Sequence, residues 1–210
     1  MVGHGEPFGG DDPFPADMDP PELLLEATVR VLSAEGIQGL TLRKVAEKAE
    51  KNRGLVHYYF ESKSHLLASL LDHILEGTRE LMDLDSADDP TEQLWRALTF
   101  HAYGPGGEDS AGRHYYEALL QLQALAANDE EIRRRLTRNH RYLVEVVSDI
   151  IRKGIANGSF RQTDPEALAM FLLSAIDGAR TVDLATDIDS ARKLTLERLD
   201  EYLKQTLYVD

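Results

Sequence analysis

The sequence has no cysteine and no long apolar stretch, and each absence excludes a kind of protein. With no cysteine among its 210 residues, the chain can form no disulfide, no thiolate metal site and no cysteine nucleophile. No stretch reaches the roughly eighteen consecutive apolar residues of a membrane-spanning helix. The N-terminus lacks the basic start and the apolar run of a secretory signal. We therefore expect a cytoplasmic protein with no membrane partner.

Motifs of catalysis and of metal binding are also missing. The seven histidines are scattered, with no HExxH motif and no pair spaced i, i+4. Neither a GxSxG elbow nor a phosphate-binding loop occurs, and the GPGG run at 104–107 precedes no Walker lysine. We predict that the protein is not an enzyme and that it needs no metal and no cofactor.

The alternation of apolar and polar residues that marks a strand is absent, whereas a helical period runs from Pro20 onward. Thr41, Asn52 and Ser62 are suited to cap three successive helices, and Gly36 is suited to end the helix before them. Further helices are expected over roughly 91–103, 111–127, 129–156, 164–183 and 189–207. We predict an all-α fold of about nine helices, preceded by a disordered acidic tail over residues 1–20.

A helix, a tight turn and a second short helix between about residues 42 and 61 match a helix-turn-helix. In the second helix, Val56 and Phe60 lie four residues apart on one face and are expected to pack inward. The opposite face is formed by Arg53, Gly54, His57 and Tyr58. Leu55 could meet a thymine methyl group, and Lys63 a phosphate. Spacing alone leaves open whether this segment binds DNA or is a helical hairpin with a solvated basic face.

The net charge of −14 is unusual for a DNA-binding protein, but its distribution matters more than its sum. Residues 1–21 carry five acids and no Lys or Arg, whereas residues 22–75 carry seven bases and seven acids. Six of those seven bases fall between residues 43 and 63. The acidic residues are therefore concentrated outside the segment that we assign to DNA.

The stretch TLRKVAEKAEKNRGLVHYYFESKSHLL (41–67), preceded by ATVRVLSAEGIQGL (27–40), resembles the DNA-binding module of the tetracycline-repressor (TetR) family. The resemblance covers about residues 22–80. It implies a DNA-binding domain of three helices over 21–80, followed by an effector-binding and dimerisation domain over 81–210. The sequence departs from the family pattern in the turn, where Glu50 and Lys51 replace a glycine and an apolar residue, and at His57, where a tyrosine is usual.

In the TetR family the short helix enters the major groove, and the lysine of the SK pair contacts a phosphate. The residues that this resemblance assigns to DNA binding are Thr41, Arg43, Asn52, Arg53, Gly54, Leu55, His57, Tyr58, Tyr59 and Lys63.

The rest of the chain is expected to supply a dimer surface and a sensing site. A helix-turn-helix reads one half-site, so a palindromic operator on double-stranded DNA requires a homodimer. The expected interface residues are Leu168, Phe171, Leu172, Ala175, Ile176, Ala179, Leu199, Tyr202 and Leu203, although the same stripes could pack within one subunit. The resemblance implies a small-molecule pocket, for which the candidates are Trp95, Phe100, His101, Tyr103, Tyr115, Tyr116 and Leu120.

These observations predict a sequence-specific transcriptional regulator, a repressor that a small-molecule effector releases from its operator. The alternative is a helical interaction protein of the same fold that has lost specific DNA binding, which Glu50 and the acidic total favour. The segment KGIANGSFRQTDPEALAMFLLSAIDGAR (153–180) is similar to the C-terminal part of the choline-responsive regulators. We infer no particular ligand from that similarity.

Overall fold

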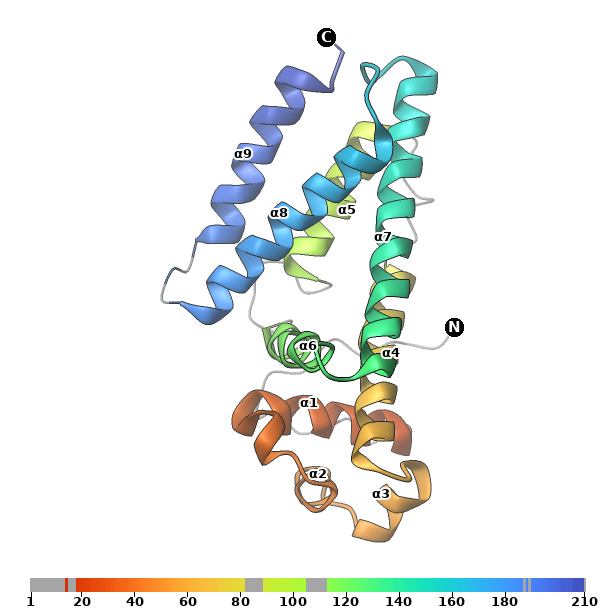
Figure 1. Ribbon diagram of the computed structural model, residues 1–210, viewed down its shortest axis with the longest axis vertical. Coiled ribbons are helices and arrows are strands. Elements are labelled where there is room, and N and C mark those ends of the chain that lie inside the picture. The colour runs from red at the N-terminus through yellow and green to blue at the C-terminus, as the bar shows by residue number, and fades with distance from the viewer. Residues whose placement is uncertain are drawn as a thin grey trace. The chain divides into compact units, whose positions relative to one another are not determined.

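A computed structural model describes residues 14, 18–81, 89–104, 113–186, 188 and 190–209 (Figure 1). Over these residues the chain forms helices and no strand, apart from an isolated bridge between Phe160 and Tyr208. The helices are α1 (Pro20–Gly39), α2 (Leu42–Lys48), α3 (Arg53–Tyr59), α4 (Lys63–Leu81), α5 (Pro90–Tyr103), α6 (Arg113–Leu125), α7 (Glu130–Asn157), α8 (Pro165–Ala185) and α9 (Ala191–Thr206). The predicted all-α fold is confirmed. Of the tail predicted over 1–20, all but Phe14 and residues 18–20 lies outside the described residues.

Helices α2 and α3 begin where the sequence places their caps, whereas α1 continues past Gly36 to Gly39. The side chains of Thr41 and Asn52 accept hydrogen bonds from the backbone amides of Lys44, at 3.2 Å, and Leu55, at 2.9 Å. Pro20 opens α1, and the left-handed backbone of Gly36, with φ of 69°, interrupts its last turns. None of the helices over the described ranges is both long and apolar enough to cross a membrane.

The chain divides into two compact units. The first comprises residues 1–78 and 108–137, and the second comprises 79–107 and 138–210. The first unit therefore contains α6 in addition to the three N-terminal helices and most of α4. The assignment of 21–80 to DNA binding and of 81–210 to sensing and dimerisation stays a prediction about function.

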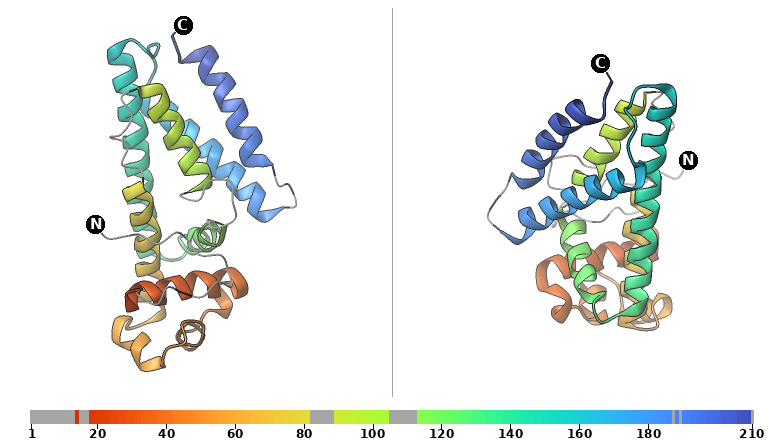
Figure 2. Two further views of the ribbon diagram at one scale, coloured as in Figure 1. Left: turned by 180° about the vertical axis from the view of Figure 1, so that it is seen from behind. Right: turned by 45° about the horizontal axis from the view of Figure 1, so that its top comes forward.

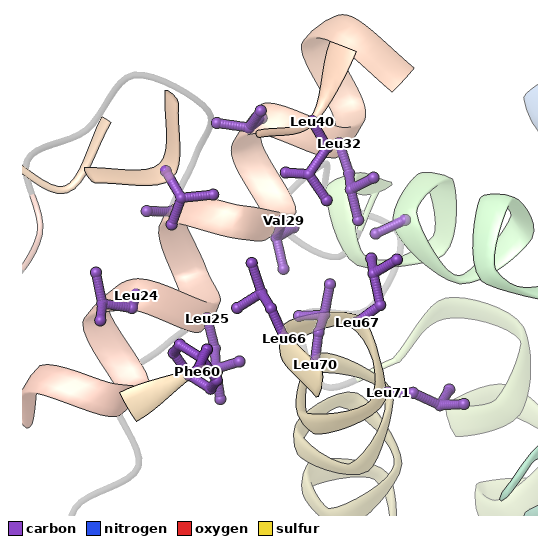
Figure 3. Close-up of a cluster of buried hydrophobic side chains, with 14 of the residues drawn as sticks. Leu24, Leu25, Val29, Leu32, Leu40, Phe60, Leu66, Leu67, Leu70 and Leu71 are labelled. Carbon is purple, nitrogen blue, oxygen red and sulfur yellow. The ribbon is translucent and has the colours of Figure 1, made fainter. Parts of the chain in front are cut away.

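The first unit is held together by leucines from helices that are distant in sequence. Figure 3 shows Leu66 and Leu70 of α4 gathered beside Leu25 and Val29 of α1, with Phe60 next to Leu25. All five of these side chains are buried. Complete burial of one such side chain contributes about 1.5–3 kcal/mol. This cluster fixes the end of α3 and the start of α4 against α1.

α6 joins α1 through polar as well as apolar contacts. The Tyr115 hydroxyl donates to the buried carboxylate of Glu26, which also lies 3.2 Å from Nε2 of His73 on α4. The amide nitrogen of Gln121 donates to the carbonyl oxygen of Leu32 at 2.8 Å. Burial and the Glu26 carboxylate raise the pKa of Tyr115 above its ordinary value, so the phenol remains a hydrogen-bond donor.

The second unit packs α5, α8, α9 and much of α7 around one apolar core. α8 and α9 are antiparallel neighbours, and α5 lies against α8 (Figure 2). Asp183 of α8 accepts hydrogen bonds from the backbone amide of Ala191, at 2.7 Å, and from Nε of Arg192, at 2.5 Å. This buried carboxylate therefore satisfies the N-terminus of α9 and fixes the corner between the two helices.

Candidate nucleic-acid interface

The turn between α2 and α3 is a Schellman motif with glutamate at the position that glycine usually occupies. The amide of Lys51 bonds to the carbonyl of Ala46 at 2.9 Å, and that of Glu50 bonds to the carbonyl of Glu47 at 3.1 Å. Glu50 has φ of 53°, which places it in the left-handed region. The departure noted in the sequence therefore falls on the residue where a glycine would relieve strain. The turn forms nevertheless, and it sets the direction of α3.

The faces of α3 are those that the spacing predicts. Val56 is 0% exposed and Phe60 is 4% exposed, so both anchor the helix to the core of the first unit. On the opposite face Arg53, Gly54, His57 and Tyr58 are all exposed, Tyr58 at 80%. Large aromatic side chains are seldom this exposed without a partner. α3 thus presents a cation, an imidazole and a phenol on a rigid, well-anchored helix.

Other residues assigned to DNA binding have partners within the module. Leu55 and Tyr59 are half-buried against the core. Nη1 of Arg43 lies 2.5 Å from the Glu47 carboxylate, one turn along α2. These residues remain predicted DNA contacts. Because they already have partners, they are less available for contact with DNA than the four exposed residues of α3.

Lys63 has a structural role that spacing does not reveal. Its ammonium group donates to the carbonyl oxygens of Ile37, at 2.7 Å, and Leu40, at 2.9 Å. These carbonyls lie at the C-terminal end of α1, where a cation is favourable. An ammonium has three donors, so one hydrogen remains for a phosphate. Lys63 therefore connects α4 to α1 whether or not it also meets DNA.

One exposed residue of the interface, Lys51, was not among the predicted contacts. Lys51 is exposed in the turn directly before Asn52, and it could have been selected because it extends the basic segment toward α3. Gly54 was predicted to allow close approach, and the structure gives a second reason for glycine there. A Cβ atom at Gly54 would lie 3.1 Å from Oδ1 of Asn52, which caps the helix.

The predicted dimer residues divide between the core and the surface of the second unit. Phe171 and Tyr202 are exposed at 50% and 39%, and Ala175 is half-buried. The other six residues, Leu168, Leu172, Ile176, Ala179, Leu199 and Leu203, are buried within the subunit. The outward stripe of α8 runs through Phe171, Ala175, Gly178 and Val182, of which Val182 was missed. On α9, Leu194 and Tyr202 are exposed eight residues apart.

The predicted pocket residues fall in different units. Tyr115, Tyr116 and Leu120 belong to α6 in the first unit, whereas Trp95, Phe100, His101 and Tyr103 belong to α5 in the second. Nε2 of His101 lies 3.0 Å from Oδ1 of Asp177, which also contacts Nη1 of Arg180 at 3.2 Å. Burial lowers the pKa of His101, although the Asp177 carboxylate opposes this shift. Burial would raise the pKa of Asp177, but the hydrogen bond from His101 and the charge of Arg180 hold it below its usual value.

Comparison with protein families gives two matches, one in each half of the chain. Residues 24–70 match "Bacterial regulatory proteins, tetR family", and residues 107–207 match "BetI-type transcriptional repressor, C-terminal". The HTH-type transcriptional regulator YfiR of Bacillus subtilis is 29% identical over 89% of this chain and 91% of its own. The transcriptional repressor NicS of Pseudomonas putida is 31% identical, over 66% of this chain and 64% of its own.

Solved structures agree with these matches. A TetR transcription regulator from Haloarcula marismortui superposes with a TM-score of 0.81 at 29% identity, covering 90% of this chain and 98% of that one. A regulator from Saccharomonospora viridis, solved in complex with choline, has a TM-score of 0.80 at 20% identity with the same coverage, which establishes a shared fold. The fold, the exposed face of α3 and these matches define a helix-turn-helix transcriptional regulator. The chain belongs to the tetR family of bacterial regulatory proteins.

Proposed function

We propose that the protein is a cytoplasmic homodimer that binds a palindromic operator through two copies of α3. In this proposal the protein represses transcription until a small-molecule effector releases it. The observation that carries the proposal is the exposed face of α3. Arg53, His57 and Tyr58 are exposed there, while Val56 and Phe60 on the opposite side are buried. A cation and planar polar groups on a fixed helix suit the edges of bases in a major groove.

The dimer is supported by the outward stripe of α8 and the exposed apolar residues of α9. Phe171 and Tyr202 contact each other edge to face, with ring centroids 5.6 Å apart, although both are exposed. Leu194 is 58% exposed and Val182 is 37% exposed. Ala175 and Gly178 would allow a partner helix to come close between these larger residues. A symmetric four-helix contact of α8 and α9 would bury this apolar surface.

The effector response is supported by aromatic side chains on α5 and α6 and by the relatives. Trp95 and Phe100 are half-buried beside the core of the second unit. The hydrogen bonds from α6 to Glu26 and Leu32 give it a direct mechanical connection to α1, on which α3 and α4 are packed. An effector acts by binding one conformer more tightly, so it must favour a spacing of the two α3 helices that does not fit the operator. Choline is a reasonable first compound to test because the Saccharomonospora viridis regulator was solved with it.

The experiment is an anisotropy titration of purified protein against labelled duplexes tiled across its own upstream region, with random DNA as competitor. We expect competitor-resistant binding to one palindromic duplex at two or four subunits per site. Binding that is no tighter than to random duplex at any salt concentration would favour the alternative, a helical interaction protein that has lost specific DNA binding.

A further inference from the structure

On the exposed face of α3, the side chains of Arg53 and His57 are joined to each other. Nε of Arg53 donates to Nε2 of His57 at 3.2 Å, one helical turn further along. Both side chains are exposed. Arg43 and Lys44 pair with Glu47 and Glu35, whereas Arg53 has no acidic partner in the described part of the chain. The histidine is therefore the group that orients this guanidinium.

The nitrogen that donates this hydrogen bond determines which edge of the guanidinium is left to contact another group. A guanidinium carries five N–H donors in a rigid plane, one on Nε and two on each Nη. With the Nε–H directed at His57, the remaining outward edge is the pair of Nη nitrogens with two parallel N–H bonds. That edge matches the O6 and N7 acceptors of guanine in the major groove. Adenine presents a donor in place of O6, so the same edge would reject it.

We propose that Arg53 reads a guanine in each operator half-site and that His57 is the positioning residue that turns the guanidinium edge-on to the base. This inference rests on the proposed function, in which α3 is the recognition helix. Arg53 is the first residue of α3, and the N-terminal residues of a recognition helix contact the base edges.

The positioning role depends on a hydrogen-bond acceptor at residue 57. Nε2 of His57 accepts from Arg53, and an imidazole can accept there only when its proton is on Nδ1. An arginine held in this way loses less conformational freedom when it meets the base. Glutamine at residue 57 could provide an amide oxygen at a similar reach, whereas phenylalanine provides a ring of similar size without an acceptor. His57→Gln and His57→Phe are therefore a matched pair.

The test is a binding-site selection with the full chain, from duplexes randomised over two half-sites about one helical turn apart. We expect the wild type to enrich a palindrome with guanine at one fixed position of each half. Exchanging that G·C pair for A·T should weaken wild-type binding roughly 5- to 100-fold. Arg53→Met, which keeps a long side chain but has no donor, and His57→Phe should lose most of this preference, while His57→Gln retains it. Replacing the guanine with 7-deazaguanine, which lacks N7, should weaken the wild type and leave Arg53→Met unaffected.

Circular dichroism and affinity for random duplex check that each variant is folded and still binds DNA. A wild type that enriches no palindrome would overturn the proposed function, and the present inference with it. A guanine preference that survives Arg53→Met would overturn the proposal that Arg53 reads the base. Equal preference in His57→Phe and His57→Gln would overturn the positioning role. Loss of the preference in His57→Phe but not in Arg53→Met would mean that the histidine itself reads the base.

Discussion

Glu50→Gly should stabilise the DNA-binding module, because Glu50 occupies a left-handed backbone conformation at the end of α2. A residue with a Cβ atom costs about 1–2 kcal/mol in that conformation relative to glycine. The greater conformational freedom of glycine in the unfolded chain offsets roughly 0.5–1 kcal/mol of this stabilisation. The net gain is about 0.5–1 kcal/mol, which for a chain of this length raises the Tm by about 1–4 °C.

The same substitution removes a carboxylate from the side of the module that we assign to DNA. Two unit charges about 4 Å apart in water interact by roughly 1 kcal/mol, so relief of repulsion corresponds to about fivefold tighter binding at low salt. Glu50→Gln is the matched control because it removes the charge but keeps the strained backbone. We expect both variants to bind DNA more tightly, with a gain that shrinks as salt increases. Only the glycine variant should have a higher Tm, measured by circular dichroism. A glycine variant no more stable than the glutamine variant would refute the strain argument.

Further substitutions test the other parts of the account. Lys63→Met removes the ammonium that joins α4 to the carbonyls of Ile37 and Leu40, so we expect a loss of about 1–3 kcal/mol in denaturant unfolding without DNA; unchanged stability would contradict the structural role. Gly178→Ala meets no atom within 4 Å of the added Cβ in the described part of its own subunit. It should raise helix propensity by about 0.8–1 kcal/mol, yet weaken the dimer in sedimentation equilibrium; a dimer of unchanged strength would argue against α8 as the interface. Because burial lowers the pKa of His101 in the folded protein, the unfolded chain takes up this proton first as the pH falls below 6.5. The free energy of unfolding should thus decrease as the pH falls from about 7.5 to about 5.5, and it should decrease less steeply in His101→Gln. Equal slopes in the two proteins would contradict the lowered pKa of His101.

Much of the fold follows from short-range patterns in the sequence. Thr41 and Asn52 are spaced so that each caps its own helix, and these contacts need no information from elsewhere in the chain. Val56 and Phe60 likewise define the buried face of α3 by their spacing alone. Features that depend on local hydrogen bonding and helical period are therefore predictable, and they include the exposed face of α3.

Features that depend on distant partners could not be predicted in this way. The Lys63 ammonium bonds to a carbonyl 26 residues earlier, and a basic residue before a long helix could equally serve a phosphate. An apolar stripe indicates that a helix is buried on one side but not against which neighbour. For this reason Leu172 and Ile176 were expected at the dimer interface, with packing inside one subunit as the alternative, and they are buried within the subunit's own core. Hydrogen bonds such as that from Tyr115 to Glu26 also join residues too far apart in sequence for periodicity to reveal.

The most direct test of the central claim is a competitive anisotropy titration that compares the wild type with an Arg53→Ala, Tyr58→Ala double variant. Both side chains are exposed, so their truncation should leave the unfolding temperature nearly unchanged. The duplex is the tightest-binding one from the upstream region, and random duplex is the competitor. We predict that the wild type resists the competitor and that the double variant binds both duplexes equally weakly. A folded double variant that still prefers the specific duplex as strongly as the wild type would contradict the assignment of α3 as the recognition helix.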